Sequence, residues 1–205
     1  MNNIDVLVII ITYNAMTWIN KCLTSCSKFN VLIIDNNSAD NTLDHIRTFF
    51  PSVKISENKI NIGFGQACNI GMRYAIKNDI DYVFLLNQDA YLKEDTIRNL
   101  ILVHENKPQY AILSPIHLNG KGENFDYSFK QHTLDFIDEE LYFNNNNKKI
   151  FNVPFVNAAA WLIPTKVLKK IGGFSPIFFH YGEDNNYCQR VLYHGYKIGV
   201  VSDAI

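Results

Sequence analysis

Residues 6–14 read VLVIIITYN, an unbroken apolar and largely β-branched run that ends in three polar residues. A strand that is buried on both faces, as in a parallel sheet between two layers of helices, has this pattern. Apolar residues at helical spacing follow in Met16–Cys26, and a second short apolar run occupies Val31–Ile34. The chain is therefore predicted to begin with a strand, a helix and a second strand.

The same alternation continues through the first half of the chain. We predict further strands at Val53–Ser56 and Tyr82–Leu86, and helices over Thr42–Phe49, around Ala67–Ala75 and around Ile97–His104. Strands that are joined by helices through short connections form right-handed crossovers and a mostly parallel sheet. The predicted fold class is therefore α/β, with one Rossmann-like, mostly parallel sheet flanked by helices.

The second half of the chain has a less regular pattern. Asn119–Lys149 is polar and rich in asparagine, so we predict a hairpin and a mobile loop there. Beyond it, helices are predicted at Thr165–Ile171 and from Glu183 to the turn at Gly195, with a last strand at Lys197–Val201. No linker separates independent parts, which favours a single domain over residues 1–205.

The composition argues against several classes of protein. The 205 residues include 19 basic and 20 acidic side chains, without the basic stripe that a nucleic-acid-binding protein normally has. The four cysteines lack C-x-x-C spacing, as expected for reduced thiols in a cytosolic protein. No signal peptide is recognisable, and no apolar run approaches the roughly 18–20 residues of a transmembrane helix. We therefore expect a cytoplasmic protein with no nucleic-acid partner.

Polar residues gather where the predicted strands end. The first strand ends in Thr12-Tyr13-Asn14, the second in Asp35-Asn36-Asn37-Ser38 and the fourth in Asn87-Gln88-Asp89, while the third leads into Asn61–Gly65. Each group alone is explained by turns and helix caps, which favour Asn and Asp. Four such groups at one edge of a parallel sheet favour a ligand site instead.

The residue types at this edge suit a pyrimidine nucleotide. Asp35 can accept a hydrogen bond and Asn36 can accept and donate, which matches the edge of uracil or thymine, and Tyr13 offers a flat face for the base. The glycines of Asn61–Gly65 allow the backbone to approach a ligand closely. The sequence has neither a phosphate-binding G-x-x-x-x-G-K-[ST] loop nor G-x-G-x-x-G after the first strand, which argues against P-loop ATPases and dinucleotide dehydrogenases.

Taken in order, these motifs resemble those of family 2 glycosyltransferases, especially the rhamnosyltransferase-like branch. The resemblance continues through Phe155–Pro164, Gly172-Gly173-Phe174 and Phe178–Asp184, and only Asn119–Lys149 falls outside it. It implies a GT-A fold and an inverting enzyme that moves a sugar from a UDP- or dTDP-linked donor to a saccharide or lipid-linked acceptor, in the synthesis of surface polysaccharide. It also implies a cytoplasmic location, with peripheral association at the inner face of the membrane as an option.

The resemblance assigns residues to the donor site. It places the nucleotide-sugar site in residues 1–110 and the acceptor and catalytic part in residues 111–205. Asp89 stands where the family holds Mg²⁺ or Mn²⁺, which neutralises the charge of the leaving diphosphate. The other residues implied to bind the nucleotide sugar are Thr12, Tyr13, Asn14, Asp35, Asn36, Asn61, Gly63, Asn69, Asn87, Gln88, Asn157 and Ala158.

The resemblance also assigns the catalytic residues. Glu183-Asp184 matches the family's ED motif, in which Asp184 is the general base that takes the proton of the acceptor hydroxyl. An alternative is that both acids only interact with the dipole of a helix N-terminus. The neighbouring Phe178, Phe179 and Tyr181 pack either the acceptor sugar or the core, and the sequence does not separate these two roles.

Two departures from the family pattern leave alternatives open. Asn157-Ala158-Ala159 stands where relatives often have a Gly-Ala pair, which implies an altered donor-sugar pocket. Relatives usually carry a metal-binding His just beyond the strand predicted at Lys197–Val201, whereas this sequence ends at Ile205. We expect a piece of a longer enzyme rather than an incomplete metal site, because His180 and His194 are poor substitutes. The alternatives are a nucleotide-sugar-binding module without turnover and a sugar-nucleotide pyrophosphorylase, and the oligomeric state is open.

Overall fold

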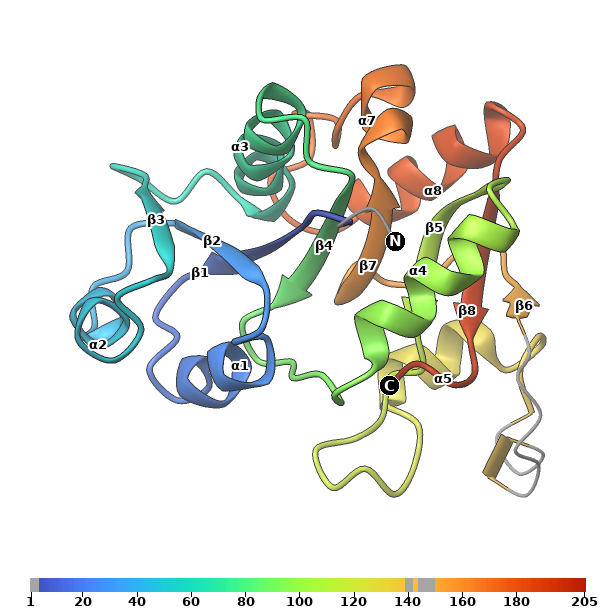
Figure 1. The fold of residues 1–205 in the computed structure, drawn as a ribbon, viewed down its shortest axis with the longest axis horizontal. Helices are drawn as coiled ribbons and strands as arrows, with labels where there is room; N and C mark the ends of the chain where they lie inside the picture. Colours follow the sequence, from blue (N-terminus) through green and yellow to red (C-terminus); the bar gives the residue numbers. More distant parts are fainter. Residues whose placement is uncertain (1–3, 139–141, 144–149) are drawn as a thin grey trace.

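The computed structural model describes residues 4–138, 142–143 and 150–205 (Figure 1). The strands within these residues are β1 (Val6–Thr12), β2 (Asn30–Asp35), β3 (Lys54–Glu57), β4 (Tyr82–Asn87), β5 (Tyr110–Pro115), β6 (Ile150–Asn152), β7 (Ala160–Pro164) and β8 (Lys197–Val201). The helices are α1 (Ile19–Ser25), α2 (Thr42–Phe49), α3 (Phe64–Lys77), α4 (Thr96–Asn106), α5 (Tyr127–Thr133), α7 (Thr165–Ile171) and α8 (Glu183–Tyr193).

All the described strands join one sheet in the order β3-β2-β1-β4-β7-β5-β8-β6. β1 pairs in parallel with β2 and β4, β2 pairs in parallel with β3, and β5 pairs in parallel with β8. β7 lies antiparallel between β4 and β5, and β6 is antiparallel to β8 at the edge. The prediction of a mostly parallel α/β sheet is therefore confirmed, with two antiparallel strands that the sequence pattern did not indicate.

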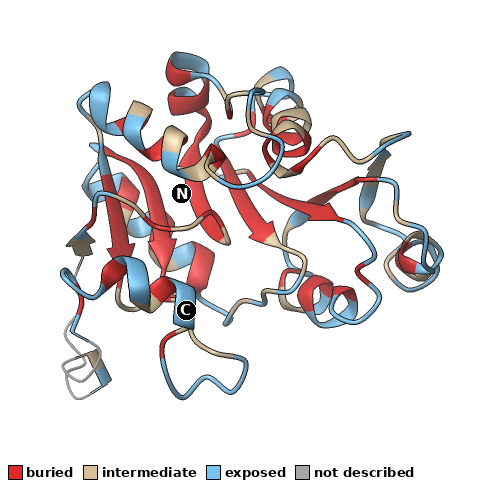
Figure 2. Cartoon of the chain, turned by 180° about the vertical axis from the view of Figure 1, so that it is seen from behind, coloured by how far each residue is buried: buried red, intermediate tan, exposed pale blue. Residues whose placement is uncertain are grey.

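Helices cover both faces of the sheet, and β1 shows why its sequence is apolar throughout. On one face, Leu7, Ile9 and Ile11 belong to a core cluster that also contains side chains of α3, α5, α7 and α8. Val6, Val8 and Ile10 pack with α1, α2 and α4 on the other face. Figure 2 shows the strands in the centre of the sheet as buried residues between these two layers. A strand covered on both sides has no polar face, which explains the unbroken run of residues 6–11.

Several predicted elements need correction. α1 begins at Ile19 rather than Met16, since residues 16–18 form a turn. Within Asn119–Lys149, a bridge between Leu118 and Phe125 forms the expected hairpin, but the next residues form α5 instead of a loop. This short helix depends on Asp126, whose side chain accepts a hydrogen bond from Phe129 N, and on the burial of Phe129. The rest of the predicted mobile loop, residues 139–141 and 144–149, lies outside the described residues.

The close approach of α3 to β1 depends on a glycine. A Cβ atom added at Gly71 would lie 2.6 Å from Ile9 Cδ1 and 2.7 Å from Ile9 Cγ2. Because Ile9 is buried in the centre of the sheet, it has little room to move away. Gly71 therefore sets the spacing of α3 from the sheet, and with it the place of the N-terminus of α3 at the edge where β1 ends.

We predict that Gly71→Ala destabilises the fold by up to about 2 kcal/mol. Overpacking costs about 1–3 kcal/mol, and the better helix propensity of alanine recovers at most about 1 kcal/mol. Urea unfolding of Gly71→Ala, Ile9→Ala and the double variant checks this. Because Ile9→Ala removes the clashing atoms, the double variant should lose less stability than the sum of the two single variants. Strictly additive losses would contradict the proposed contact.

No helix in the described part of the chain combines the length and the hydropathy that crossing a membrane requires. This agrees with the absence of a long apolar run in the sequence.

Candidate active site

The register of the central strands brings the polar strand ends to one edge of the sheet. Thr12 at the end of β1 pairs with Asp35 at the end of β2. On the other side of β1, Ile11 pairs with Asn87 at the end of β4. Asp35 in turn pairs with Glu57 at the end of β3. The strand ends that the sequence singled out therefore lie next to one another, as an open parallel sheet requires.

At the centre of this edge, Asp35 is a buried acceptor of hydrogen bonds. Its Oδ1 accepts from Thr12 Oγ1 at 2.7 Å and from Ser38 Oγ at 2.6 Å, while its Oδ2 accepts from Ser38 N at 2.8 Å. Thr12 and Asp35 are each at most 1% exposed. A carboxylate has about four acceptor positions, so this network fixes the carboxylate and leaves one position on Oδ2.

The side chain of Asn36 holds the loop that follows β3 through hydrogen bonds. The Nδ2 of Asn36 donates to Gly63 O at 3.2 Å, and its Oδ1 accepts from Asn58 Nδ2 at 2.9 Å. Within the loop, Asn61 Oδ1 accepts from Gly63 N at 2.9 Å. Gly63 has a φ of 83°, and a Cβ atom there would lie 2.0 Å from Phe179 O. Only glycine fits this position, and the loop is held between β2 and the segment that precedes α8.

Tyr13 presents its ring to solvent beside this network. The ring is 48% exposed, whereas the backbone of Tyr13 is tied to Gln88: Tyr13 N donates to Gln88 Oε1 at 2.8 Å, and Gln88 Nε2 donates to Tyr13 O at 3.3 Å. The side chain of Asn14 accepts a hydrogen bond from Ala39 N at 2.8 Å. Gln88 and Asn14 therefore use their amides to hold the strand ends together, and Tyr13 is the flat exposed group at this edge.

Asp89 lies in a cavity of about 550 Å³ on the other side of β1. Asn87, His117, Asp126 and Asn157 also line this cavity. His117 Nε2 lies 3.0 Å from Ser114 Oγ, and burial lowers the pKa of His117 to about 4, so its imidazole is neutral at physiological pH. Asn157 Oδ1 is buried beside His117, close enough to counteract part of the lowering of the pKa of His117, and makes no hydrogen bond of standard geometry within the described residues. The cavity thus combines uncharged polar groups with the carboxylates of Asp89 and Asp126, and Lys21, Lys93 and Lys121 also line it.

The residues around Asp89 fit a hard divalent cation that is bound together with a diphosphate. Among the described residues, no three His, Cys, Asp or Glu side chains lie close enough to hold a metal ion by themselves. The oxygen ligands in the cavity are the carboxylates of Asp89 and Asp126 and the amide of Asn157. Mg²⁺ commonly binds in this way, through one or two carboxylates and the phosphates of a substrate.

The two acids at the start of α8 have different surroundings. Glu183 is 5% exposed and packs against Gly65 of α3, and its Oε2 finds no hydrogen-bond donor within the described residues. Burial, with the charge of Asp184 as a smaller cause, raises the pKa of Glu183. Asp184 is only partly buried, and its Oδ1 accepts from Asn185 N at 2.7 Å. Of the pair, Asp184 is therefore the carboxylate that a substrate can reach.

Asp184 does not line the cavity of Asp89, although packing connects the two. One turn after Asp184, Cys188 Sγ lies 4.0 Å from Val156 O. Val156 directly precedes Asn157, which lines the cavity together with Asp89. The first turns of α8 thus pack on the segment that forms one wall of this cavity.

Two of the residues implied by the sequence point elsewhere. Asn69 bonds through both ends of its amide to the backbone of Phe174, at 2.8 Å and 2.9 Å, and ties α3 to the segment after α7. The side chain of Ala158 is 6% exposed and belongs to the core. Ser38, which the sequence placed in the polar group after the second strand, supports the edge through its hydrogen bonds to Asp35. Asn58 also supports the edge and was not singled out, although it follows the end of β3. His117 lies in a stretch where no motif pointed to it.

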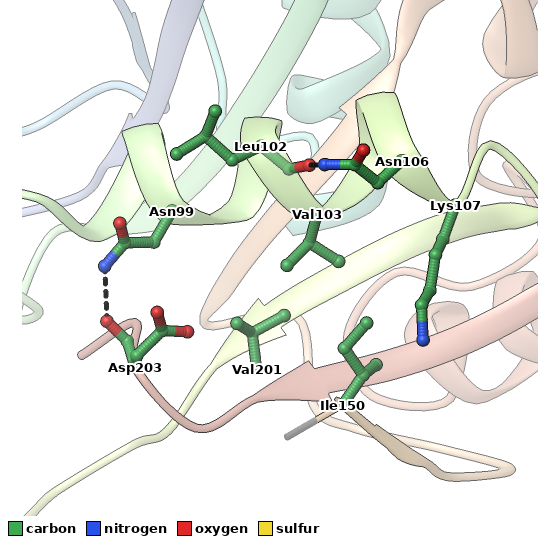
Figure 3. A pocket seen from close by; sticks show the side chains of 8 residues that line it. All are labelled: Asn99, Leu102, Val103, Asn106, Lys107, Ile150, Val201 and Asp203. Atoms are coloured by element: carbon green, nitrogen blue, oxygen red, sulfur yellow. Dashed lines mark hydrogen bonds between the residues drawn. The ribbon is translucent and has the colours of Figure 1, made fainter. Parts of the chain in front are cut away.

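A second cavity, of about 280 Å³, lies between α4 and β8 (Figure 3). Leu102, Val103 and Val201 line it, and Asn99 Nδ2 donates to Asp203 O at 2.5 Å across it. None of the residues that the sequence assigned to the site takes part in it. The candidate active site is therefore the edge that holds Asp35, Tyr13 and Asp89.

Comparison with known proteins decides the family. The model of the family described as glycosyl transferase family 2 matches residues 7–172. The chain belongs to glycosyl transferase family 2. The predicted family is thereby confirmed, and the pyrophosphorylase alternative loses its support.

The similar proteins are distant. The dTDP-rhamnosyl transferase RfbF of Shigella flexneri is 20% identical over 98% of this chain and 68% of its own length. The poly(ribitol-phosphate) β-N-acetylglucosaminyltransferase TarS of Staphylococcus aureus is 22% identical over 96% of this chain and 34% of its own length.

Solved structures confirm the GT-A fold. TarS residues 1–349 in complex with UDP superpose with a TM-score of 0.69 at 19% identity, over 98% of this chain and 58% of that one. GalNAc-T7 with UDP, GalNAc and Mn²⁺ gives a TM-score of 0.74 at 15% identity, over 99% of this chain and 43% of that one. This chain therefore spans little more than half of the TarS fragment that it matches.

Proposed function

We propose that this chain is the catalytic domain of an inverting glycosyltransferase that takes a sugar from a UDP- or dTDP-linked donor. The observation that carries the proposal is the buried Asp35 carboxylate, which is held by Thr12 and Ser38 with one acceptor position left, beside the exposed ring of Tyr13. Uracil and thymine both present an N–H donor and a flat face. One fixed acceptor and one aromatic ring match these two features.

In the proposed donor complex, the diphosphate extends from Asp35 toward Asp89. The direction follows from the strand order, because β1 separates Asp35 at the end of β2 from Asp89 after the end of β4. Asp89, with the amide oxygen of Asn157 nearby, would hold Mg²⁺ or Mn²⁺, which neutralises the charge that develops on the leaving diphosphate. The structure of GalNAc-T7, which contains UDP and Mn²⁺, is consistent with such a cofactor.

Asp184 is the proposed general base. Its carboxylate takes the proton of the acceptor hydroxyl while the hydroxyl oxygen forms a bond to the anomeric carbon. The bond from the anomeric carbon to the diphosphate oxygen breaks on the opposite face, and the electron pair leaves with the nucleoside diphosphate. This single displacement inverts the anomeric configuration. The burial of Glu183 against α3 anchors the first turn of α8 and so positions Asp184.

For the cellular role, we propose a saccharide or lipid-linked acceptor and a product that belongs to a surface polysaccharide. Residues 1–110 would bind the nucleotide sugar, and residues 111–205 would supply the base and the acceptor side. A lipid-linked acceptor would bring the protein to the inner face of the membrane from the cytoplasm. The activity of RfbF, as its name states it, is consistent with a dTDP-linked donor.

Thermal unfolding with added nucleotides tests the proposal. UDP or dTDP at a hundredfold excess over its Kd should stabilise the fold by about 2.7 kcal/mol, which raises Tm by several degrees, and Mn²⁺ should increase the shift. GDP and ATP serve as controls for phosphate binding without a pyrimidine. A panel of UDP- and dTDP-sugars then identifies the donor by release of the nucleotide. If neither UDP nor dTDP shifts Tm more than GDP does, the proposed donor site is wrong.

A further inference from the structure

The loop that leads into α8 exposes a group of large apolar side chains. We call residues 176–181 the aromatic loop. Within it, the exposed fractions are 82% for Ile177, 59% for Phe179 and 79% for Tyr181. Single exposed apolar residues are common on proteins, but several on one short loop mark a surface that contacts something else. The sequence left open whether Phe179 and Tyr181 pack the core or the acceptor sugar. Their exposure excludes the core for both residues.

Contacts with the donor side hold the aromatic loop in place. Phe179 O lies against Gly63, where a Cβ atom would approach it to 2.0 Å, and Gln66 Nε2 donates to Pro176 O at 3.4 Å. The rings of His180 and Tyr181 lie with their centroids 3.9 Å apart and their planes tilted by 36°. Tyr181 itself has a φ of 65°, a conformation that a bulky residue keeps only when its surroundings impose it. The exposed rings are therefore presented on a fixed backbone.

The aromatic loop is also close to the proposed base. Tyr181 precedes Asp184 by three residues, so their Cα atoms are at most about 11 Å apart. Asp184 is partly exposed at the start of α8, on the side from which the loop enters the helix. The two residues are therefore close enough in the chain for one bound molecule to contact both of them.

We propose that the aromatic loop is the acceptor subsite, in which the ring of Tyr181 packs against one face of a saccharide whose hydroxyl is held at Asp184. Phe179 and Ile177 extend this apolar surface. The inference rests on the proposed function and names its acceptor class as a saccharide. A sugar ring presents C–H groups on its faces and hydroxyls around its rim, and an aromatic side chain with a polar tip suits both.

The charges around the loop favour a saccharide over a lipid surface. Between Lys170 and Arg190 the sequence contains no lysine or arginine, whereas it contains Glu183 and Asp184. Loops and helices that bind to anionic membranes normally carry basic residues around their apolar side chains. The aromatic loop has no lysine or arginine of its own, so it lacks the charge that would hold it on an anionic membrane.

Steady-state kinetics of Tyr181→Ala test the subsite with the saccharide acceptor that the wild type uses best in a panel of methyl glycosides. The KM for this acceptor should rise about tenfold, which corresponds to the binding free energy of one aromatic contact, while kcat changes little. The Tm shift caused by UDP with Mn²⁺ should stay that of the wild type, which shows that the fold and the donor site are intact. Tyr181→Phe keeps the ring and should restore the KM. Tyr193→Ala, which removes an 89% exposed tyrosine at the other end of α8, is the matched control.

An unchanged acceptor KM in Tyr181→Ala would overturn the subsite. If that variant also lost sedimentation with vesicles of phosphatidylglycerol and phosphatidylethanolamine, the loop would be assigned to a lipid surface instead. Failure of the proposed function gives a different result from failure of the subsite. The wild type would then transfer no sugar to any acceptor, and the inference about the subsite would be wrong as well.

Discussion

Asp184→Asn is expected to lower the rate of sugar transfer by roughly 10²- to 10⁴-fold while nucleotide binding stays unchanged. The substitution keeps the size of the side chain and removes its negative charge, and with it the ability to take a proton. Asp184 lies at the start of α8, away from the Asp35 network that is proposed to bind the base, so the donor should bind as before. Initial rates with the identified donor and acceptor, together with the Tm shift by UDP and Mn²⁺, measure both properties.

The matched control for this variant is Asp95→Asn. Asp95 stands at the N-terminus of α4, exposed and 3.8 Å from Arg98, and it is remote from the proposed acceptor. If Asp184 only interacted with the dipole of its helix, the two variants would lose a similar few tenths of a kcal/mol of stability and no activity. A fully active Asp184→Asn enzyme would remove Asp184 from the role of base. A loss of the UDP shift in that variant would instead mean that Asp184 belongs to the donor site.

The parts of the fold that the sequence predicted well are those whose order comes from local patterns. β1 and β8, together with α2 and α7, have the predicted bounds because apolar runs, helical spacing and a flanking proline or glycine are visible within ten residues or so of sequence. The motifs at the strand ends could be placed at one edge because parallel strands all end on the same side of a sheet.

The elements that were not predicted depend on distant contacts. β7 becomes a strand by pairing with β4, as in the pair Leu85 and Trp161, which are far apart in the sequence. α5 has few apolar positions and is stabilised by one cap and by the burial of Phe129. Neither contact leaves a periodic signal in the sequence.

The same distinction explains the site. The positions of Asp35 and Asp89 at the sheet edge could be predicted because a strand end determines where they lie, and their roles in binding stay predictions. The contact of Asn69 could not be predicted, because its amide bonds to Phe174, a residue 105 positions away that only the folded chain brings near. Glu183 was assigned to catalysis together with Asp184, and its burial against Gly65 indicates instead that it anchors the helix. Neighbours in a motif can thus have different surroundings, because successive residues of a helix point about 100° apart.

Asp89→Asn is expected to abolish the part of the UDP-induced Tm shift that depends on Mn²⁺ and to lower transfer by roughly a hundredfold or more. The reason is that Asp89 is the exposed carboxylate of its cavity, and no cluster of three acidic, His or Cys side chains in the described residues could hold the ion in its place. An amide oxygen carries no charge and binds a divalent cation much more weakly than a carboxylate. Titration with MnCl₂ at fixed UDP measures the loss directly.

The control is Asp126→Asn, which changes the other acid that lines the same cavity. Asp126 caps α5 through its side chain, and asparagine caps helices about equally well, so the fold should keep its stability. If Mn²⁺ binding depended only on the total negative charge of the cavity, both variants would lower the affinity for Mn²⁺ to the same extent. We expect Asp126→Asn to retain the Mn²⁺ response.

Uridine, which lacks the diphosphate, separates recognition of the base from recognition of the metal in the Asp89→Asn protein. Its binding depends on Asp35 and Tyr13, whose contacts do not include Asp89, so its affinity should equal that of the wild type. UDP should then bind to Asp89→Asn no more tightly with Mn²⁺ than without it. A variant that loses uridine as well would show that Asp89 supports the edge of the sheet as a whole, and the division between a base site at Asp35 and a metal site at Asp89 would be wrong.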